Sequence, residues 1–166
     1  MFSPRIAQRS STARILGVVS LVLFVSKLDG ARSAAGGAGQ TDPWSMSEVI
    51  QPADLARDLS KGLKPQVICV GVEALYRGAH ISGAVYLGPA SKPEGLEALK
   101  KWAKGTPRGE RIVLYCGCCP MDKCPNIRPA FQALKEMGFT RLQVLSIPQD
   151  LVRDWVSKGF PVEKAN

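Results

Sequence analysis

The stretch RIVLYCGCCPMDKCPNIR, residues 111–128, joins an apolar run to a dense group of cysteines. The run over 111–116 predicts a buried strand, because short continuous apolar segments are typical of strands that are covered on both faces. The apolar spacing over 127–137, which Gly138 closes, predicts a helix. Four of the chain's five cysteines therefore lie in one strand-to-helix loop.

The rest of the chain alternates apolar runs with amphipathic segments in the same manner. Further strands are predicted over 49–50, 66–70, 84–88 and 142–145. Further helices, each closed by a glycine, are predicted over 52–62, 93–105 and 148–159. Buried strands that alternate with helices indicate an α/β protein whose parallel sheet has helices on both faces. A chain of 166 residues has room for one such domain.

Cys116 occupies the kind of position at which parallel sheets bind their ligands. Such ligands bind at the carboxyl ends of the strands, where loops lead into the N-termini of helices. The backbone N–H groups of such a loop and the positive end of a helix favour a thiolate over a thiol. We therefore expect Cys116 to be a nucleophile.

Four segments carry a further pattern: AHISGAVYL (79–87), IVLYC (112–116), ALKEMGFTRLQVL (133–145) and DWVSKGFPV (154–162). The first is similar to the G-H-I-P-G-A segment of the rhodanese-like domain family. The second matches that family's strand ending in the catalytic cysteine, the third its next helix, glycine and strand, and the last its closing W-x-x-x-G-x-P-V. The chain resembles this family over residues 46–163, and the resemblance implies a single rhodanese-like domain.

The resemblance also implies a sulfurtransferase. In that reaction a cysteine, here Cys116, attacks the outer sulfur of a donor such as thiosulfate, holds it as a persulfide, and passes it to a thiol or cyanide. Its partners are small molecules, and it needs no cofactor. Lys123 and Arg128, near the helix start, are positioned to attract an anionic donor. The substrate-binding loop then comprises Gly117, Cys118, Cys119, Lys123, Cys124 and Arg128.

The chain departs from the family pattern in two places. The loop after Cys116 is longer than the usual ring and contains three additional cysteines. The Asp-x-Arg that follows the second strand in the family is replaced here by Cys69-Val70-Gly71. Cys69 lies within a predicted strand, so we expect it to be a small buried apolar residue.

The additional cysteines allow three interpretations, which the sequence leaves open. In an oxidising compartment, Cys124 would form a disulfide with Cys118 or Cys119. Alternatively, Cys116, Cys118, Cys119 and Cys124, in the pattern C-x-C-C-x4-C, would bind a thiophilic metal, a soft monovalent ion rather than zinc. Thirdly, the additional thiols would relay or resolve sulfur bound at Cys116.

Two functions other than sulfur transfer follow from these interpretations. One is a non-enzymatic module whose cysteine loop binds a thiophilic metal or a partner. The other is a thiol-disulfide redox protein, because CGCC (116–119) also contains C-x-x-C. A cysteine phosphatase is not expected, since the position that would carry its phosphate-binding arginine is Asp122.

The first 35 residues have the three-part pattern of a secretory signal peptide. Arginines precede the apolar segment ILGVVSLVLFV (15–25), and small residues follow it. Residues 1–35 are therefore predicted to be a signal peptide, with an N-terminal anchor as the alternative, and 36–45 a linker. Cleavage is expected within 34–40. The protein is then exported, periplasmic or secreted, and it contacts a membrane only if the leader stays uncleaved.

The net charge of +8 does not indicate a nucleic-acid partner. Five of the 22 Lys/Arg and one of the 14 Asp/Glu lie in residues 1–35, so half of the net charge belongs to the leader. The remaining basic residues are scattered and form no patch that the sequence reveals.

Overall fold

The computed structural model describes residues 41–165 of the chain. The signal peptide or anchor predicted over 1–35 lies outside these residues, as does the first half of the linker predicted over 36–45. Among the helices of residues 41–165, none is both long enough and apolar enough to cross a membrane.

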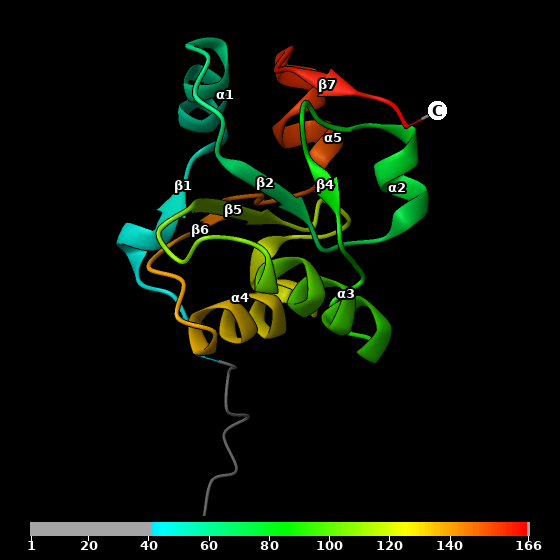
Figure 1. Cartoon of the computed structure of the whole chain (residues 1–166). Coiled ribbons are helices and arrows are strands. Elements are labelled where there is room, and N and C mark those ends of the chain that lie inside the picture. The colour runs from blue at the N-terminus through cyan, green and yellow to red at the C-terminus, as the bar shows by residue number, and fades with distance from the viewer. Residues whose placement is uncertain (1–40, 166) are drawn as a thin grey trace, which may run out of the picture. The chain divides into compact units, whose positions relative to one another are not determined.

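A five-stranded parallel sheet forms the centre of the fold (Figure 1). From edge to edge its strands are β1 Val49–Ile50, β6 Arg141–Leu145, β5 Arg111–Tyr115, β2 Gln66–Cys69 and β4 Val85–Tyr86. In the central strand β5, Leu114 pairs with Ile68 on one side and with Val144 on the other. The parallel sheet predicted from the sequence is confirmed.

Five α-helices connect or follow the strands in the described part of the chain. They are α1 Pro52–Ser60, α2 Glu73–Gly78, α3 Pro93–Lys104, α4 Ile127–Glu136 and α5 Leu151–Asp154. Short 3-10 turns cover Met46–Glu48, Met121–Lys123 and Val156–Lys158. Pro52 and Pro93 begin α1 and α3, where a missing N–H removes no helical hydrogen bond. Asp150 caps α5 by accepting from the backbone N–H of Arg153 at 2.8 Å.

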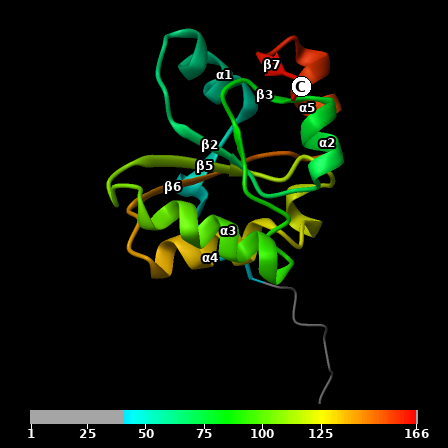
Figure 2. The ribbon, with the colours of Figure 1, turned by 45° about the vertical axis from the view of Figure 1, so that its right-hand side comes forward.

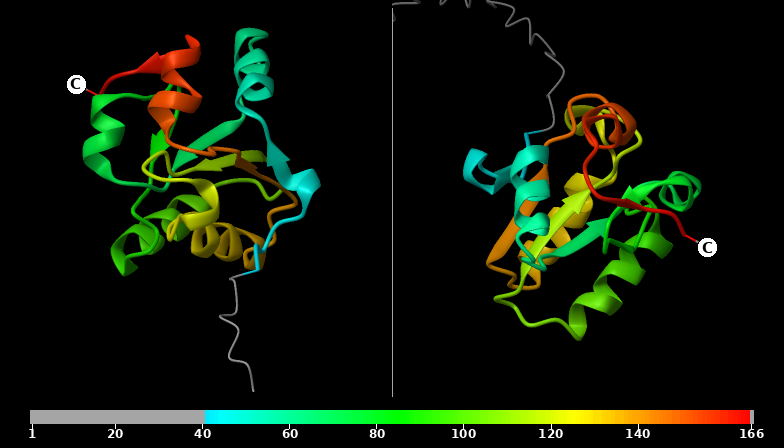
Figure 3. Two further views of the ribbon diagram at one scale, coloured as in Figure 1. Left: turned by 180° about the vertical axis from the view of Figure 1, so that it is seen from behind. Right: turned by 90° about the horizontal axis from the view of Figure 1, so that it is seen from above.

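Alternate side chains of β5 enter two apolar cores, one on each face of the sheet. Ile112 and Leu114 are fully buried among residues of α3 and α4. Val113 and Tyr115 are buried on the opposite face, among residues of α1 and α5. Figure 2 shows α3 and α4 together below the sheet with α1 and α5 above it, and Figure 3 shows the same layers from behind and from above. The expected helices on both faces are thus confirmed.

A short helix and a small second sheet were not predicted from the sequence. β3 (His80–Ile81) pairs antiparallel with β7 (Val162–Glu163) at the edge of the domain. Two-residue strands and the six-residue α2 are too short for their apolar pattern to repeat. His80 is buried, its ring stacks on Tyr76, and its Nδ1 lies 2.8 Å from the Tyr76 carbonyl oxygen.

Trp44 belongs to the folded domain, although it lies in the segment predicted as a linker. Its side chain is 8% exposed, and its ring meets Phe131 of α4 edge-on with 5.6 Å between the ring centroids. The guanidinium of Arg128 lies 5.6 Å from the centroid of the same ring. A single aromatic residue among small polar ones forms no periodic pattern. The domain was therefore predicted to start after Trp44.

We expect Trp44→Ala to lower the free energy of unfolding by about 3–5 kcal/mol, as is typical when a buried tryptophan is truncated. Met46→Ala is the matched control, because Met46 is 85% exposed, and it should change the free energy by less than about 0.5 kcal/mol. Urea denaturation of the full chain measures both. Equal stabilities of the two variants would show that Trp44 does not stabilise the domain.

Candidate active site

The cysteine loop leaves the central strand of the sheet and ends at α4. Cys116 is the first residue after β5, which lies between β2 and β6. The loop continues through the 3-10 turn Met121–Lys123 and enters α4 at Ile127. Because the neighbouring strands are parallel, Cys116 lies at the carboxyl edge of the sheet, where ligands of such folds bind.

Gly71 allows the chain after β2 to pass directly against Cys116. A Cβ atom at Gly71 would overlap the backbone carbonyl of Cys116 and would lie 3.1 Å from its sulfur. Only glycine permits so close an approach. The Sγ of Cys69 donates to the same carbonyl oxygen over 3.9 Å. The segment that replaces the family's Asp-x-Arg therefore forms a close, uncharged wall beside Cys116.

Four sulfur atoms gather at this edge of the sheet. The Sγ of Cys116 lies 3.0 Å from that of Cys118, which in turn lies 3.4 Å from that of Cys119. The sulfurs of Cys116, Cys119 and Cys124 all lie within 4.8 Å of one another. Cys116 and Cys124 are buried, and the other two are half-buried. All four are free thiols in the structure, so a disulfide from Cys124 stays a prediction.

Asn126 contacts the sulfur of Cys116 and was not predicted as a site residue. Its amide nitrogen donates to that sulfur over 3.4 Å, and its amide oxygen accepts from the backbone N–H of Ser91 over 2.9 Å. Because a backbone N–H can only donate, the oxygen must face Ser91 and the NH2 group must face Cys116. In a sequence, asparagine before a helix indicates a cap. Here the side chain makes no capping hydrogen bond and is 3% exposed.

The start of α4 lies close to Cys124, which ends the cysteine loop. The backbone N–H groups of Asn126 and Ile127, at the start of α4, act to lower the pKa of Cys124. The pKa of Cys124 is nevertheless raised, first by its hydrogen bond with the Cys116 side chain and then by burial. Burial is also the largest cause that raises the pKa of Cys118 and of Cys119. These three thiols are therefore protonated at neutral pH and are poor nucleophiles there.

Arg128 holds the loop in place. Its guanidinium donates to the carbonyl oxygens of Cys124 at 3.2 Å and Asp122 at 2.8 Å, and it forms an ion pair with Asp42 at 2.6 Å. The Arg128 side chain is only 12% exposed as a result. Lys123 is exposed on the 3-10 turn. Of the two cations predicted to attract a donor, Lys123 is therefore the one in solvent.

An apolar cavity of about 200 Å³ lies beside Cys116. Gly117, with φ of +80°, turns the loop here, and its carbonyl accepts from the backbone N–H of Leu151 at 3.1 Å. The rest of the lining comes mainly from α2 and α5, and none of the lining residues is charged. The sequence did not predict α2, so it did not predict the wall of the cavity that this helix forms.

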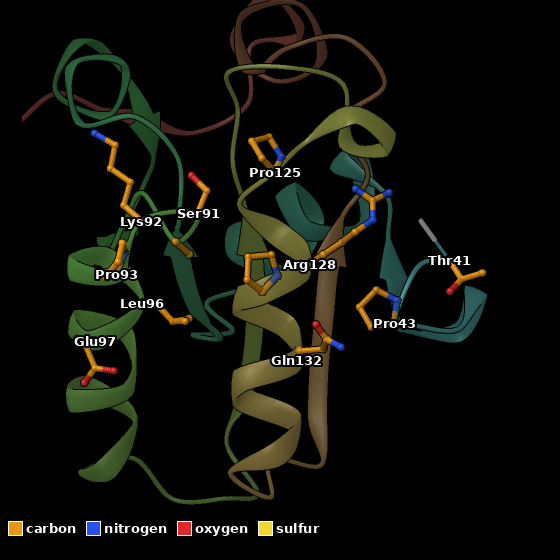
Figure 4. Close-up of a pocket in the computed structure, with 12 residues that line it drawn as sticks. Thr41, Pro43, Ser91, Lys92, Pro93, Leu96, Glu97, Pro125, Arg128 and Gln132 are labelled. Atoms are coloured by element: carbon orange, nitrogen blue, oxygen red, sulfur yellow. The ribbon is translucent and has the colours of Figure 1, made fainter. Parts of the chain in front are cut away.

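A second cavity, of about 760 Å³, is lined by residues from α3, α4 and the segment before the first strand (Figure 4). Lys92 at the start of α3 and Arg128 of α4 contribute positive charge to it. None of its lining residues is a cysteine. Ser91 lies in its wall and donates to Asn126, so this wall is connected to Cys116 through the Asn126 amide.

Several solved structures are similar to this chain. The rhodanese-like domain of the Alr3790 protein from Anabaena sp. is 18% identical, with a TM-score of 0.53, over 72% of this chain and 81% of that one. The BH2092 protein from Bacillus halodurans is 24% identical, with a TM-score of 0.56, over 71% and 77%. The polysulfide-sulfur transferase homodimer from Wolinella succinogenes is 15% identical, with a TM-score of 0.50, over 72% and 82%.

A comparison with protein-family models gives no match, and a comparison with curated protein sequences gives none either. The identities to the solved structures named above are all below 25%. Likeness at that level shows the fold of this chain. Its chemistry has to be argued from its own residues.

Cys69 tests the effect of burial on a thiol beside the cavity. Burial is the main cause that raises its pKa to about 11, so at about pH 8 it is almost wholly protonated, and only the thiolate is alkylated. We expect iodoacetamide to leave Cys69 unmodified in the folded chain and to modify it in urea, where its pKa returns to about 8.5. Labelling of the folded chain should increase as the pH rises towards 11. Peptide mass spectrometry measures this, and equal labelling with and without urea would contradict it.

Proposed function

We propose that this chain, which has the rhodanese-like fold expected from its sequence, is a sulfurtransferase that uses Cys116 as its sulfur carrier. It moves sulfane sulfur from a donor such as thiosulfate to a thiol or cyanide. The observation that carries the proposal is the setting of Cys116. Its thiol is buried at the end of the central strand with an amide donor on its sulfur, and the residue also lines a cavity.

The reaction consists of two displacements at sulfur. In the first, the Cys116 thiolate attacks the outer sulfur of thiosulfate, the donor's S–S bond breaks, and sulfite leaves with the bonding electron pair. In the second, an acceptor thiolate or cyanide attacks the outer sulfur of the Cys116 persulfide, and Cys116 leaves as a thiolate. Electrons balance within each displacement, so no external oxidant or reductant is consumed.

The amide of Asn126 supports the negative charge that Cys116 carries at the start and end of each cycle. Hydrogen bonds to a charged acceptor are stronger than those between neutral groups. Because Ser91 fixes the amide oxygen, the NH2 group already faces the sulfur before the reaction begins. Such a fixed donor needs no reorganisation when charge develops.

The cavity beside Cys116 supports the entry of a small donor or acceptor. A dianion such as thiosulfate would lose hydration against a lining without charge. Exposed Lys123 is the loop residue best suited to draw anions to the site from solvent. The lining therefore favours persulfides and thiols with small apolar bodies, with thiosulfate as a slower donor.

A second candidate function is thiol–disulfide exchange through Cys116 and Cys118. The 3.0 Å between their sulfurs favours it. If the Cys118 thiolate attacked the inner sulfur of a Cys116 persulfide, a Cys116–Cys118 disulfide would form and hydrosulfide would leave. A reducing thiol would then be required for each further turnover. Dependence of turnover on such a reductant distinguishes this function from simple transfer.

We also propose that the protein is exported, periplasmic or secreted, and that its partners are small sulfur compounds rather than nucleic acid. The three-part leader pattern over 1–35 supports export. The even scatter of basic residues after the leader supports the absence of a nucleic-acid partner.

Cys116→Ser should reduce release of sulfite from thiosulfate, in the presence of cyanide, to the level without protein. The serine hydroxyl cannot form a persulfide, whereas the change is small enough to leave β5 and α4 packed. Sulfite release by the full chain, with circular dichroism to confirm folding, is the measurement. Undiminished release by the folded variant would show that the carrier is another thiol.

Asn126→Ala should lower the rate of the same reaction by roughly 10- to 100-fold, the loss expected when one hydrogen bond to a charged group disappears. Asn126→Asp keeps the shape and the bond from Ser91, but it places a carboxylate against the sulfur, so we expect it to be slower still. Stopped sulfite assays on both variants test this. A wild-type rate for Asn126→Ala would rule out a role for the amide.

A further inference from the structure

Three of the four loop thiols converge on one point. Cys116 begins the loop, Cys119 lies within it, and Cys124 closes it before α4, yet their sulfurs lie within 4.8 Å of one another. We propose that Cys116, Cys119 and Cys124 form a binding site for a single Cu(I) ion. This property goes beyond sulfur transfer, and the binding itself does not depend on that activity.

The spacing of the three sulfurs fits a three-coordinate ion. Thiolate sulfurs bind ions such as zinc at about 2.3 Å, so three sulfurs in a plane around one ion lie about 4 Å apart. Sulfurs at the observed limit of 4.8 Å would each move inward by about half an ångström to reach that distance. Side-chain torsions supply such a shift without a change in the backbone.

Cys118 is excluded from the site, although the sequence allowed all four cysteines. Its sulfur lies 3.0 and 3.4 Å from those of Cys116 and Cys119, closer than the about 4 Å that separates the ligands of a three-coordinate ion, and it does not belong to the group of sulfurs that includes Cys124. Within residues 41–165, no histidine or carboxylate joins the three thiols at the same distance. The protein therefore offers three sulfur ligands at this point.

Three soft ligands without a fourth favour Cu(I) over zinc. Thiolates select soft ions, and Cu(I) is among the ions they favour, whereas zinc in structural sites is almost always four-coordinate. The chain's single histidine, His80, is held elsewhere, with its ring nitrogens near the Tyr76 carbonyl and Glu163. Burial of Cys116 and Cys124 also leaves little access for water to complete a tetrahedron.

Hydrogen bonds around the sulfurs suit thiolates that share one ion. The Asn126 amide donates to the Cys116 sulfur over 3.4 Å. The guanidinium of Arg128 donates to the Cys124 carbonyl and brings positive charge near a site that is anionic when loaded. Each thiol releases its proton to solvent as it binds. Donors in this outer layer orient metal ligands and stabilise their charge.

The two chemistries exclude one another, because both use Cys116. A Cu(I)-loaded loop has no free thiolate with which to attack a donor, and a persulfide on Cys116 removes one ligand from the site. This consequence rests on the proposed function, whereas the binding does not.

The test is a titration of the full chain with Cu(I), reduced and without oxygen, in competition with a Cu(I) chelator such as bathocuproine disulfonate. We expect a single equivalent to bind, with ultraviolet thiolate-to-copper absorption. Cys119→Ser and Cys124→Ala should each weaken binding by more than about 100-fold, beyond the loss of 10- to 100-fold that is typical of outer-layer residues. Cys118→Ser is the matched control from the same loop and should bind Cu(I) like the unchanged chain.

Circular dichroism checks each variant, and if Cys124→Ala unfolds, the half-buried Cys119 carries the test. Loss of binding in Cys118→Ser, unchanged binding in Cys119→Ser, or tighter binding of Zn(II) than of Cu(I) by the full chain would overturn the proposed site. Sulfur transfer through Cys116 in a chain that binds no Cu(I) would overturn this inference alone. If the chain binds one equivalent of Cu(I) but takes up no sulfur, the Cu(I) site is supported and the proposed sulfurtransferase function is contradicted.

Discussion

Burial of β5 on both faces is the constraint on which the site depends. Its side chains fill two cores at once, so the strand cannot shift along its axis without opening both. The backbone N–H of Val70 donates to the Tyr115 carbonyl at 2.9 Å, and Gly71 then packs against Cys116. The first loop residue is thus fixed from two sides. The rest of the loop is free to be long and rich in cysteine without displacing it.

Crowding of thiols is the second constraint, and it follows from the first. Buried thiolates that lie close together repel one another, so few of them can be charged at the same time. The four thiols have different neighbours: Asn126 donates to Cys116, the backbone at the start of α4 acts to lower the pKa of Cys124, and Cys118 lies against Cys116. A persulfide, a disulfide and a bound metal ion are three states that such a group of neighbouring sulfurs can adopt. Cys116 takes part in the proposed persulfide, in the Cys116–Cys118 disulfide of the second candidate function and in the proposed Cu(I) site.

The layers of the fold and the position of Cys116 were predictable from the sequence, because β5 and α4 are long enough for their apolar patterns to repeat. The small sheet around His80 and the helix α2 were not, since their elements are too short. Asn126 was not predicted as a site residue, because an asparagine directly before a helix usually indicates a cap. Its side chain makes no capping bond here, and the bond from the Ser91 N–H to its amide oxygen leaves its NH2 group facing the Cys116 sulfur. Trp44 was predicted to lie outside the domain, because its packing against Phe131 of α4 is a single long-range contact that no sequence pattern reveals.

The central claim is that, among four neighbouring thiols, the one fixed by β5 carries the sulfur. The most direct measurement is fragment-ion mass spectrometry of the full chain after exposure to thiosulfate and rapid blocking of free thiols. The account predicts one added sulfur atom on Cys116, with Cys118, Cys119 and Cys124 blocked as unmodified thiols. Added sulfur on any of those three, or none on Cys116, would contradict it.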